Sequence, residues 1–421
     1  MSAEPTEFSI LKKWIIENGG SFHPNVQFKY AGTTGNTAIA IEGIPADASI
    51  VSCPFSLVIT EERAQKNLSS LFSTEDVIGW TERQWISTYI CLHWILSDSK
   101  PPELAHYPYI NTLPISDQLR TSLWFTEPEL EAFKGSNLYA ATIDRKHEWK
   151  EEWQQCQSIL SSQNDVWGRG LTWWAFMSLT RYLTAATYIS SRAFPSSLLS
   201  PNPTLKTTEA TKPVLLPGVD SLNHKRGQPV SWSIAYPIES GPTSSTSITK
   251  EPTVSLVLHI ETLVGGELFN NYGPKPNAEL ILGYGFALPN NPDDTILLKI
   301  AGFEGRWEIG RSASGAEALW IELVQYVKRH RGNDDEEGEA YEIQMDATDI
   351  LSHMVQTLLE KLPPGTILDD QTLRPEVANM LQEYTQGQRA ILTSLLHFCE
   401  KKEEAAVDLA RSLGIELVIE D

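Results

Sequence analysis

The sequence predicts an α+β protein in which strand-forming segments lie on both sides of a long helical stretch, and a second helical stretch ends the chain. Residues 230–236 and 254–260 alternate apolar with small or polar residues, which is the period of a half-buried strand. Residues 74–195 and the region from about residue 300 have helical periodicity instead. With 421 residues, the chain has room for roughly two or three domains.

The N-terminal part combines one helix with short strands. Residues 6–18 have an amphipathic helical pattern, and the Gly-Gly pair that follows is a helix stop signal. Further along, the segments 38–41 and 49–51 are predicted strands on either side of the turn-forming residues 43–47.

The long helical stretch begins with a capped helix. Thr81 and Gln84 have the spacing of a capping box, and His93 is expected in or beside the core rather than as a ligand. A second, apolar-rich helix is predicted over residues 171–190, with its aromatic side chains in the core. One face of the first helix carries apolar residues at helical spacing: Trp85, Tyr89, Leu92 and Leu96.

The remaining segments are predicted from composition and period. Residues 195–213 are rich in Ser, Pro and Thr and predict a surface loop, and a similar piece, 237–252, predicts an extended hairpin loop. Two strongly periodic helices are expected over residues 316–328 and 348–362. The acidic run 334–339 between them predicts a solvated loop.

The composition excludes several classes of protein. A net charge of −21 opposes phosphate binding, so no nucleic-acid partner is expected. Acidic surface either attracts a basic protein partner or only aids solubility, and both explanations stay open. The apolar runs are too short for a membrane span, and the N-terminus lacks the pattern of a secretory signal. Four scattered cysteines indicate a reducing compartment, the cytoplasm or the nucleus, rather than a zinc site or a disulfide framework: Cys53, Cys91, Cys156 and Cys399.

Two short segments carry the strongest functional signal. The first is Asp220-Ser221-Leu222-Asn223-His224, and the second is Phe269-Asn270-Asn271-Tyr272-Gly273-Pro274, which runs on through Asn277-Ala278-Glu279-Leu280 into Tyr284-Gly285-Phe286. Either segment alone fits an ordinary turn. Together and in this order, they resemble the two C-terminal motifs of SET-domain methyltransferases, in the branch of the Rubisco large-subunit and ribosomal-protein lysine methyltransferases.

This resemblance implies a β-rich SET domain with a helical insertion, followed by an all-α C-terminal substrate-binding domain. Residues 384–392 also resemble the YRxGQxxIL stretch in the C-terminal domain of the same branch. The implied divisions are an N-terminal helix with the first SET segment at 1–73, the insertion at 74–194, the C-terminal SET segment at 195–298 and the substrate-binding helices at 299–421.

The resemblance also implies an activity. The chain would transfer a methyl group from S-adenosylmethionine, without a metal, to a lysine of a non-histone protein, with ribosomal and translation proteins as candidates. It would act as a monomer on a basic protein substrate, away from membranes. Two alternatives stay open: a histidine acceptor, as in one branch of the family, or a binding protein that has kept the fold and lost catalysis.

Roles for single residues follow from the same resemblance. Tyr272 would be catalytic, because its hydroxyl would orient the amine and the methyl group. The methyl donor would be bound by Asn223, His224, Gly35, Arg192 and Phe286, and the substrate by Ser191, Asp220 and Tyr284. The structural alternatives for Arg192, Asp220 and Phe286 are a helix C-terminus, a loop cap and core packing. Thr37 stands where the family has a second glycine, which favours the inactive alternative.

Overall fold

The computed structural model describes residues 3–32, 35–75, 77–173, 180–236, 251–300, 302–331, 340–364 and 372–415. The acidic run 334–339, most of the hairpin loop 237–252 and the middle of the predicted helix 171–190 lie outside these ranges. None of the helices in the described ranges is long and apolar enough to cross a membrane.

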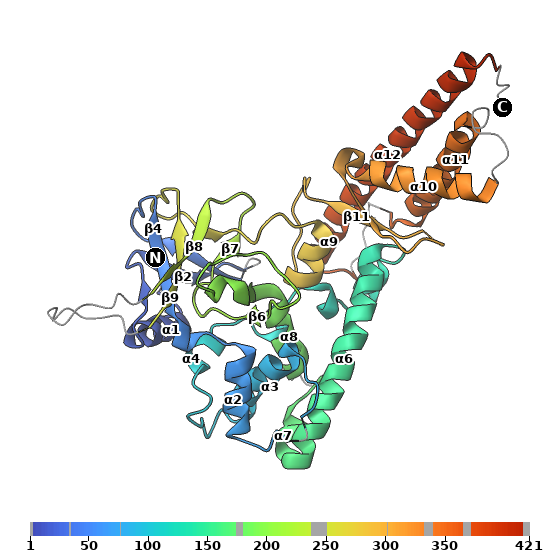
Figure 1. The fold of residues 1–421 in the computed structure, drawn as a ribbon. Coiled ribbons are helices and arrows are strands. Elements are labelled where there is room, and N and C mark those ends of the chain that lie inside the picture. The colour runs from blue at the N-terminus through green and yellow to red at the C-terminus, as the bar shows by residue number, and fades with distance from the viewer. Residues whose placement is uncertain are drawn as a thin grey trace. The chain divides into compact units, whose positions relative to one another are not determined.

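The chain forms two compact units (Figure 1). The first unit comprises residues 1–119 and 146–274, and the second comprises residues 120–145 and 275–421. Residues 120–145 fall inside the stretch that the sequence groups as a helical insertion, yet they cluster with the C-terminal residues. The second unit is therefore built from two segments that are far apart in the sequence.

A four-stranded antiparallel sheet lies at the centre of the first unit, where blue and yellow-green strands meet in Figure 1. Its order is β1 (Ser21–Phe22), β4 (Ala48–Pro54), β9 (Thr253–Leu258) and β8 (Val230–Ala235). The two alternating segments of the sequence are thus the neighbouring strands β8 and β9, as predicted. Val254, Leu256 and Leu258 of β9 are fully buried, which fixes the register because a slip of one residue would turn them outward.

Three shorter strand pairs lie among the described residues of the first unit. β2 (Val26–Tyr30) pairs with β3 (Asn36–Ala40), β5 (Phe194–Pro195) with β6 (Pro213–Val214), and β7 (Asn223–His224) with β10 (Phe269–Asn270). The last pair is parallel and joins the two sequence motifs directly. Pairing of residues from both motifs is what places the candidate site.

Helices of the first unit follow most of the predicted pattern. They are α1 (Thr6–Glu17), α2 (Glu61–Ser69), α3 (Glu82–Ile95), α4 (Tyr107–Ile110), α7 (Asp165–Gly170), α8 (Arg181–Arg192) and the part of α6 (Asn137–Gln163) from residue 146. The prediction of a helix starting at residue 171 was wrong. Leu171 and Trp173 are buried without being helical, and the Thr172 hydroxyl accepts a hydrogen bond from the Arg181 backbone N–H, so α8 begins only there.

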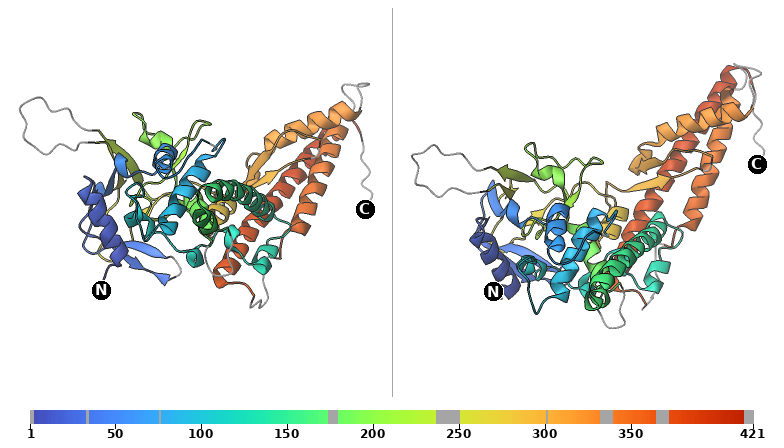
Figure 2. Two further views of the ribbon diagram at one scale, coloured as in Figure 1. Left: turned by 90° about the horizontal axis from the view of Figure 1, so that it is seen from below. Right: turned by 60° about the horizontal axis from the view of Figure 1, so that its bottom comes forward.

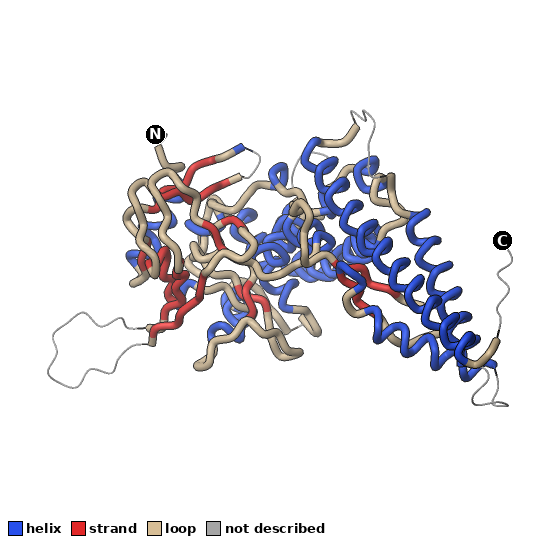
Figure 3. Tube along the Cα trace, turned by 90° about the horizontal axis from the view of Figure 1, so that it is seen from above, coloured by secondary structure: helices blue, strands red, loops and turns tan. Residues whose placement is uncertain are grey.

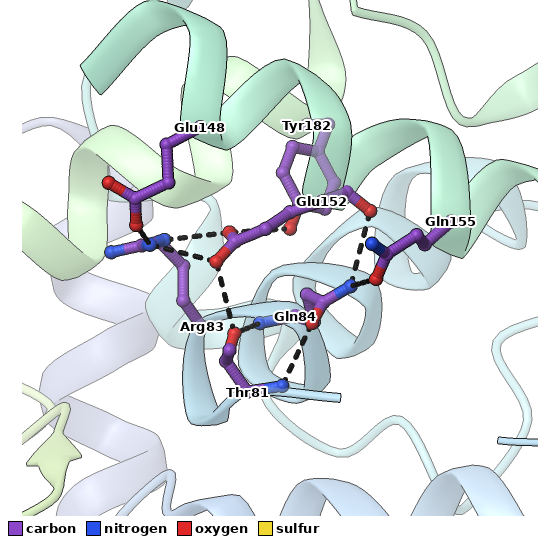
Figure 4. A network of polar contacts seen from close by, with 7 residues as sticks. All are labelled: Thr81, Arg83, Gln84, Glu148, Glu152, Gln155 and Tyr182. Carbon is purple, nitrogen blue, oxygen red and sulfur yellow. Dashed lines mark hydrogen bonds and ion pairs between the residues drawn. The ribbon is translucent and has the colours of Figure 1, made fainter. Parts of the chain in front are cut away.

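A polar network holds α3 against α6 (Figure 4). The predicted capping box is present, with Thr81 and Gln84 each accepting the other's backbone N–H. The Arg83 guanidinium donates to both carboxylate oxygens of Glu152 at 2.8 Å and also pairs with Glu148. A two-pronged pair of this kind fixes geometry as well as charge, so it sets where the two helices meet.

The second unit is mostly helical, as Figure 3 shows. A hairpin of β11 (Thr295–Leu298) and β12 (Trp307–Gly310) leads into α10 (Ala316–Arg331), α11 (Ala340–Lys361) and α12 (Pro375–Ser412), which lie side by side (Figures 1 and 2). Both periodic segments of the sequence are confirmed as parts of α10 and α11. β12 is the exception to the all-α expectation for residues after 298. The helices share a core that includes Leu319, Leu323, Leu351, Val355 and Leu395.

Residues 120–145 add a second apolar cluster to this unit. α5 (Glu127–Glu131) is capped by Thr126, and its Glu129 carboxylate is fully buried. The Arg374 guanidinium donates to both oxygens of Glu129 at 2.7 Å. Apolar side chains around this pair close the cluster: Phe125, Phe133, Leu138, Ile281, Val377, Met380, Leu381 and Tyr384. The ion pair and the cluster bind the start of α12 to residues 120–145.

Candidate functional site

The parallel pairing of β7 with β10 brings the two motifs together in the first unit. Asn223 lies opposite Phe269, and His224 lies opposite Asn270. The Lys225 backbone N–H extends this pairing by donating to the Asn270 carbonyl at 2.9 Å. Tyr272, two residues after β10, therefore follows directly from the paired segment.

Two hydrogen bonds and a ring contact hold Tyr272. Its hydroxyl donates to the Leu222 carbonyl at 2.9 Å, and its backbone N–H donates to Nδ1 of His224 at 3.0 Å. The rings of Tyr272 and His224 stack with centroids 5.0 Å apart. Because Nδ1 accepts a hydrogen bond, a neutral His224 carries its proton on Nε2. The phenol is thus fixed over the Leu222-Asn223-His224 backbone.

Asn223 is held by an acidic neighbour. Its Nδ2 donates to Oε1 of Glu267 at 2.9 Å and lies 3.5 Å from the Asn36 carbonyl. Asn36 opens β3, the strand that follows the Gly35 turn. Gly35 has φ +72°, a conformation that favours glycine, and apart from its chain neighbours no atom of the described residues lies within 4 Å of where its Cβ would stand. The turn is therefore tied to the first motif through Asn223.

Asp220 is buried and paired, with a side chain only 1 % exposed. Its Oδ2 accepts a hydrogen bond from the Tyr109 hydroxyl at 2.6 Å and lies 3.6 Å from Nη1 of Arg192, which also donates to the Asp220 carbonyl at 3.0 Å. Burial raises the pKa of Asp220, while Arg192 and Tyr109 oppose that rise. Oδ1 of Asp220 is also buried and has no hydrogen-bond partner among the described residues.

Three further candidate residues belong to the first unit: Ser191, Arg192 and Thr37. The Ser191 hydroxyl, in the last turn of α8, donates to the Thr187 carbonyl at 2.8 Å. Arg192 ends the same helix, so both residues of the predicted Ser-Arg pair belong to one turn. Thr37, at the position where the resemblance predicts a second glycine, is 2 % exposed, and its hydroxyl has no hydrogen-bond partner in the described part of the chain.

Tyr284 and Phe286 belong to the second unit. A π-helical turn, Leu280–Tyr284, ends at Gly285, whose φ is +85°. A Cβ on Gly285 would stand 2.6 Å from the Arg120 carbonyl carbon, so no larger residue fits there. The rings of Tyr284 and Phe286 meet edge to face, and the Lys275 ammonium lies 5.6 Å from the Tyr284 ring. Burial raises the pKa of Tyr284.

The second motif also contains a residue that supports the backbone. Asn277 is fully buried, and its side chain exchanges two hydrogen bonds with the backbone of Leu288, at 3.0 and 2.8 Å. Its backbone N–H donates to Asp294 at 2.8 Å. These bonds hold the segment that follows Phe286.

Tyr109 and Glu267 are site neighbours that sequence reasoning did not single out. Tyr109 is separated from Asp220 by 111 residues, and no local pattern links the two. Glu267 had a weak signal, because it follows a Gly-Gly pair and precedes the second motif. Within the described ranges, no group of three or more His, Cys, Asp or Glu side chains is arranged to hold a metal ion.

Sequence comparison finds lysine methyltransferases, although no protein-family model matches the chain. The chain is 33 % identical over 291 residues to the ribosomal lysine N-methyltransferase set10 of Schizosaccharomyces pombe, covering 68 % of this chain and 47 % of that protein. It is 24 % identical over 318 residues to the protein-lysine N-methyltransferase EFM1 of Saccharomyces cerevisiae, covering 69 % and 51 %. An actin-histidine N-methyltransferase of Gallus gallus also matches, at 21 % identity over 296 residues, covering 70 % and 44 %. The chain spans about half the length of these relatives.

Solved structures share the fold along the whole chain. Rubisco LSMT bound to AdoMet superposes with a TM-score of 0.67 and 18 % identity, covering 99 % of this chain and 98 % of that one. The SET domain of LSMT bound to MeLysine and AdoHcy gives 0.68 and 18 %, covering 100 % and 98 %. This likeness establishes the α+β SET fold with a largely helical C-terminal region. Together with the sequence relatives, it shows that the chain belongs to the SET-domain family, in the branch of Rubisco LSMT and the ribosomal lysine methyltransferases.

Proposed function

We propose that the chain is an S-adenosylmethionine-dependent protein-lysine N-methyltransferase that acts on a non-histone protein, with ribosomal and translation proteins as first candidates. The observation that carries this proposal is the fixed Tyr272 phenol, whose hydroxyl bonds the Leu222 carbonyl beside Asn223 and His224. The match to a ribosomal lysine methyltransferase supports the choice of substrate.

The residues of the first unit fit the methyl donor. The amino-acid end of S-adenosylmethionine carries an ammonium and a carboxylate, for which an amide oxygen and a guanidinium are suitable partners. Asn223 and Arg192 supply these groups from the first motif and the end of α8. The open space at Gly35 leaves room for a ligand against the backbone. His224 would bind the donor with them, and Phe286 would pack on its adenine.

The chain's part in the reaction is to position an unprotonated amine. When bound, S-adenosylmethionine supplies a methyl group activated by a sulfonium. A free lysine has a pKa near 10.4, so deprotonating it at neutral pH costs roughly 4 kcal/mol. Apolar and aromatic surroundings lower that cost because they disfavour the ammonium. The Tyr272 hydroxyl, with its ring fixed by His224, would orient the amine toward the methyl group.

The substrate side of the proposal assigns Ser191, Asp220 and Tyr284 to the target lysine, and the helices after residue 298 to the substrate protein. Asp220 is too buried to meet a cation at the surface. Its Oδ1, which has no partner among the residues that the structure describes, and its negative charge would instead act on a lysine that has already entered. The partner is a basic protein, since the chain itself carries −21.

Labelled S-adenosylmethionine and a mixture of purified ribosomal proteins test the proposal. We expect one or a few labelled bands, and methyllysine in the hydrolysed products. The match to an actin-histidine methyltransferase makes methylhistidine the second candidate outcome, which amino-acid analysis separates from methyllysine. A chain that binds no S-adenosylmethionine in titration calorimetry and labels nothing would overturn the proposal and favour the inactive binding protein.

A further inference from the structure

We propose that Glu267 is a positioning residue of the donor site, and that its carboxylate holds the Asn223 amide with the amide oxygen turned toward the donor. This inference rests on the proposed function, because it concerns how S-adenosylmethionine is recognised. It adds a residue to which the two motifs give no role, and it explains why the amide oxygen of Asn223, rather than its NH2 group, would face the donor.

The contact itself sets the orientation of the amide. An ionised carboxylate can only accept hydrogen bonds, so the group of Asn223 that faces Glu267 must be the NH2. Nδ2 donates to Oε1 of Glu267 at 2.9 Å, and the second neighbour of Nδ2, the Asn36 carbonyl, is also an acceptor. Two acceptors on one side leave the amide oxygen on the other side. Without them, the terminal torsion of an asparagine is broad and roughly two-fold, and both orientations would be populated.

The backbone holds Glu267 firmly in place. The residues on either side of it bond β3: Gly266 accepts from the Ala40 N–H, and Leu268 donates to the Ala38 carbonyl, both at 2.9 Å. Glu267 itself is bridged to Ile39. Glu267 is therefore fixed beside β3, the strand that begins with Asn36, so the positions of both acceptors depend on the same strand.

The orientation decides which part of the donor Asn223 binds. An amide oxygen accepts a hydrogen bond from an ammonium, and such a bond is charge-assisted and short. It would repel a carboxylate. Asn223 with Glu267 thus recognises the ammonium of the amino-acid end of S-adenosylmethionine, and leaves the carboxylate of that end to a cation such as Arg192.

Titration calorimetry with S-adenosylmethionine on three folded variants tests the inference. Glu267→Ala frees the amide, and we expect the donor Kd to rise about tenfold. Glu267→Gln keeps an acceptor oxygen and should bind within about twofold of the wild type. Glu261→Ala removes an exposed carboxylate in the same connection between β9 and β10 and should change nothing. 5′-Methylthioadenosine, which lacks the amino-acid end, should bind the wild type and Glu267→Ala equally.

A reciprocal exchange gives a second test if Glu267→Ala does not fold. Asn223→Asp places two carboxylates against each other and should abolish donor binding. Adding Glu267→Gln should restore part of the affinity, because the glutamine NH2 can donate to the new carboxylate. Three results would each overturn the inference. The first is equal binding of S-adenosylmethionine by the wild type and Glu267→Ala, and the second is a Glu267→Ala variant that loses as much affinity for methylthioadenosine as for S-adenosylmethionine. The third is no recovery of donor binding in the exchange. A wild type that does not bind S-adenosylmethionine would instead overturn the proposed function.

Discussion

At the scale of single residues, the Tyr272 hydroxyl is the group on which the proposed chemistry depends. The Tyr272 hydroxyl donates a hydrogen bond to the Leu222 carbonyl oxygen at 2.9 Å. The lone pairs of the hydroxyl oxygen are therefore directed away from that carbonyl. The Tyr272 ring also stacks on His224, which restricts its rotation. The hydroxyl is thus an oriented acceptor, which suits a group that must align an amine.

Tyr272→Phe should lower the turnover number severely and leave the Kd of S-adenosylmethionine nearly unchanged, because the lost group acts at the reacting centre. The matched control is Tyr107→Phe, which also removes a hydroxyl bonded to a backbone carbonyl, that of Leu96. Each variant should lose about 1 kcal/mol of stability, the usual value of such a bond. Single-turnover kinetics decide the matter, and near-normal turnover by Tyr272→Phe would remove it from catalysis.

Two buried histidines of the first unit are fixed as neutral rings. His93 donates from Nδ1 to the Tyr89 carbonyl and accepts the His106 backbone N–H at Nε2. His106 donates from Nε2 to the Leu57 carbonyl, so its Nδ1 accepts the Tyr89 hydroxyl. In each ring, protonation would add an N–H to the nitrogen that accepts a hydrogen bond, so two hydrogen-bond donors would face each other. Burial lowers the pKa of His93 to about 4 and that of His106 to about 3.

This pair should make the protein less stable as the pH falls below about 6.5, the ordinary pKa of histidine. Below pH 6.5 the two histidines are protonated in the unfolded chain, whereas in the folded protein they stay neutral until the pH falls to their lowered pKa values of about 4 and about 3. For two such protons, the free energy of unfolding should fall by up to about 2.7 kcal/mol per pH unit. Urea unfolding at pH 7, 6 and 5 measures this slope. A flat profile, or imidazolium signals from either ring at pH 5, would contradict the assignment.

The sequence predicts the part of the site that lies within the two motifs, but not the contacts that these motifs make with distant segments. The motifs placed Tyr272 beside Asn223 and His224, and β7 and β10 do pair. The bond from Tyr109 to Asp220 had no such signal, because each residue meets the other only through the tertiary fold. Burial of Asp220 likewise depends on residues from two other segments, so its loop sequence could not reveal it.

At the scale of elements, α12 shows why one sequence motif needs a glycine. The predicted resemblance at 384–392 contains Gly387, which faces the buried Asp294 carboxylate. Gln388 beside it donates to the Thr295 carbonyl at 3.0 Å. The family resemblance placed this stretch in a helical domain, but it predicted neither the extent of the helix over Pro375–Ser412 nor the reason for the glycine. The reason for the glycine lies in Asp294 and the β11 segment that follows it, against which this part of the helix packs.

Gly387→Ala should lower the melting temperature, although alanine favours a helix by about 1 kcal/mol. The added Cβ would stand 2.2 Å from Oδ2 of Asp294. Arg311 donates to this oxygen, and the Asn277 backbone N–H donates to Oδ1 of the same carboxylate. Overpacking of this kind costs roughly 1–3 kcal/mol. The control is Gln386→Ala, at an exposed position one residue earlier, where little change is expected. Calorimetry that shows Gly387→Ala to be the more stable protein would mean that Asp294 can move aside.

At the scale of the whole molecule, local sequence patterns could not predict how the chain divides into two units. Residues 120–145 join the C-terminal residues through the Glu129–Arg374 pair and through the Leu138 N–H, which donates to the Tyr384 hydroxyl at 3.4 Å. Both contacts link positions more than two hundred residues apart, and periodicity reports only on neighbours along the chain. Deleting the residues after 298 would therefore remove the partners of 120–145. Point substitutions are the sounder test of a substrate-binding role.

Charge reversal on α12 tests the proposed substrate-binding role without removing any core residue. Glu403 and Glu404 are exposed near the C-terminal end of this helix, where a basic substrate protein would be attracted to them. The double variant Glu403→Lys/Glu404→Lys should raise the KM for the whole substrate protein, most strongly at low salt, because exposed charges are screened as ionic strength rises. The Kd of S-adenosylmethionine and the kinetics of a short acceptor peptide should not change, since neither contacts α12 in this proposal.

The control double variant, Glu7→Lys/Glu17→Lys, makes the same change of charge on exposed positions of α1 and separates a local effect from one of net charge. If both double variants raise the KM equally, the acidic surface attracts its partner as a whole. If neither does, the negative charge serves solubility, and the substrate is held by other groups.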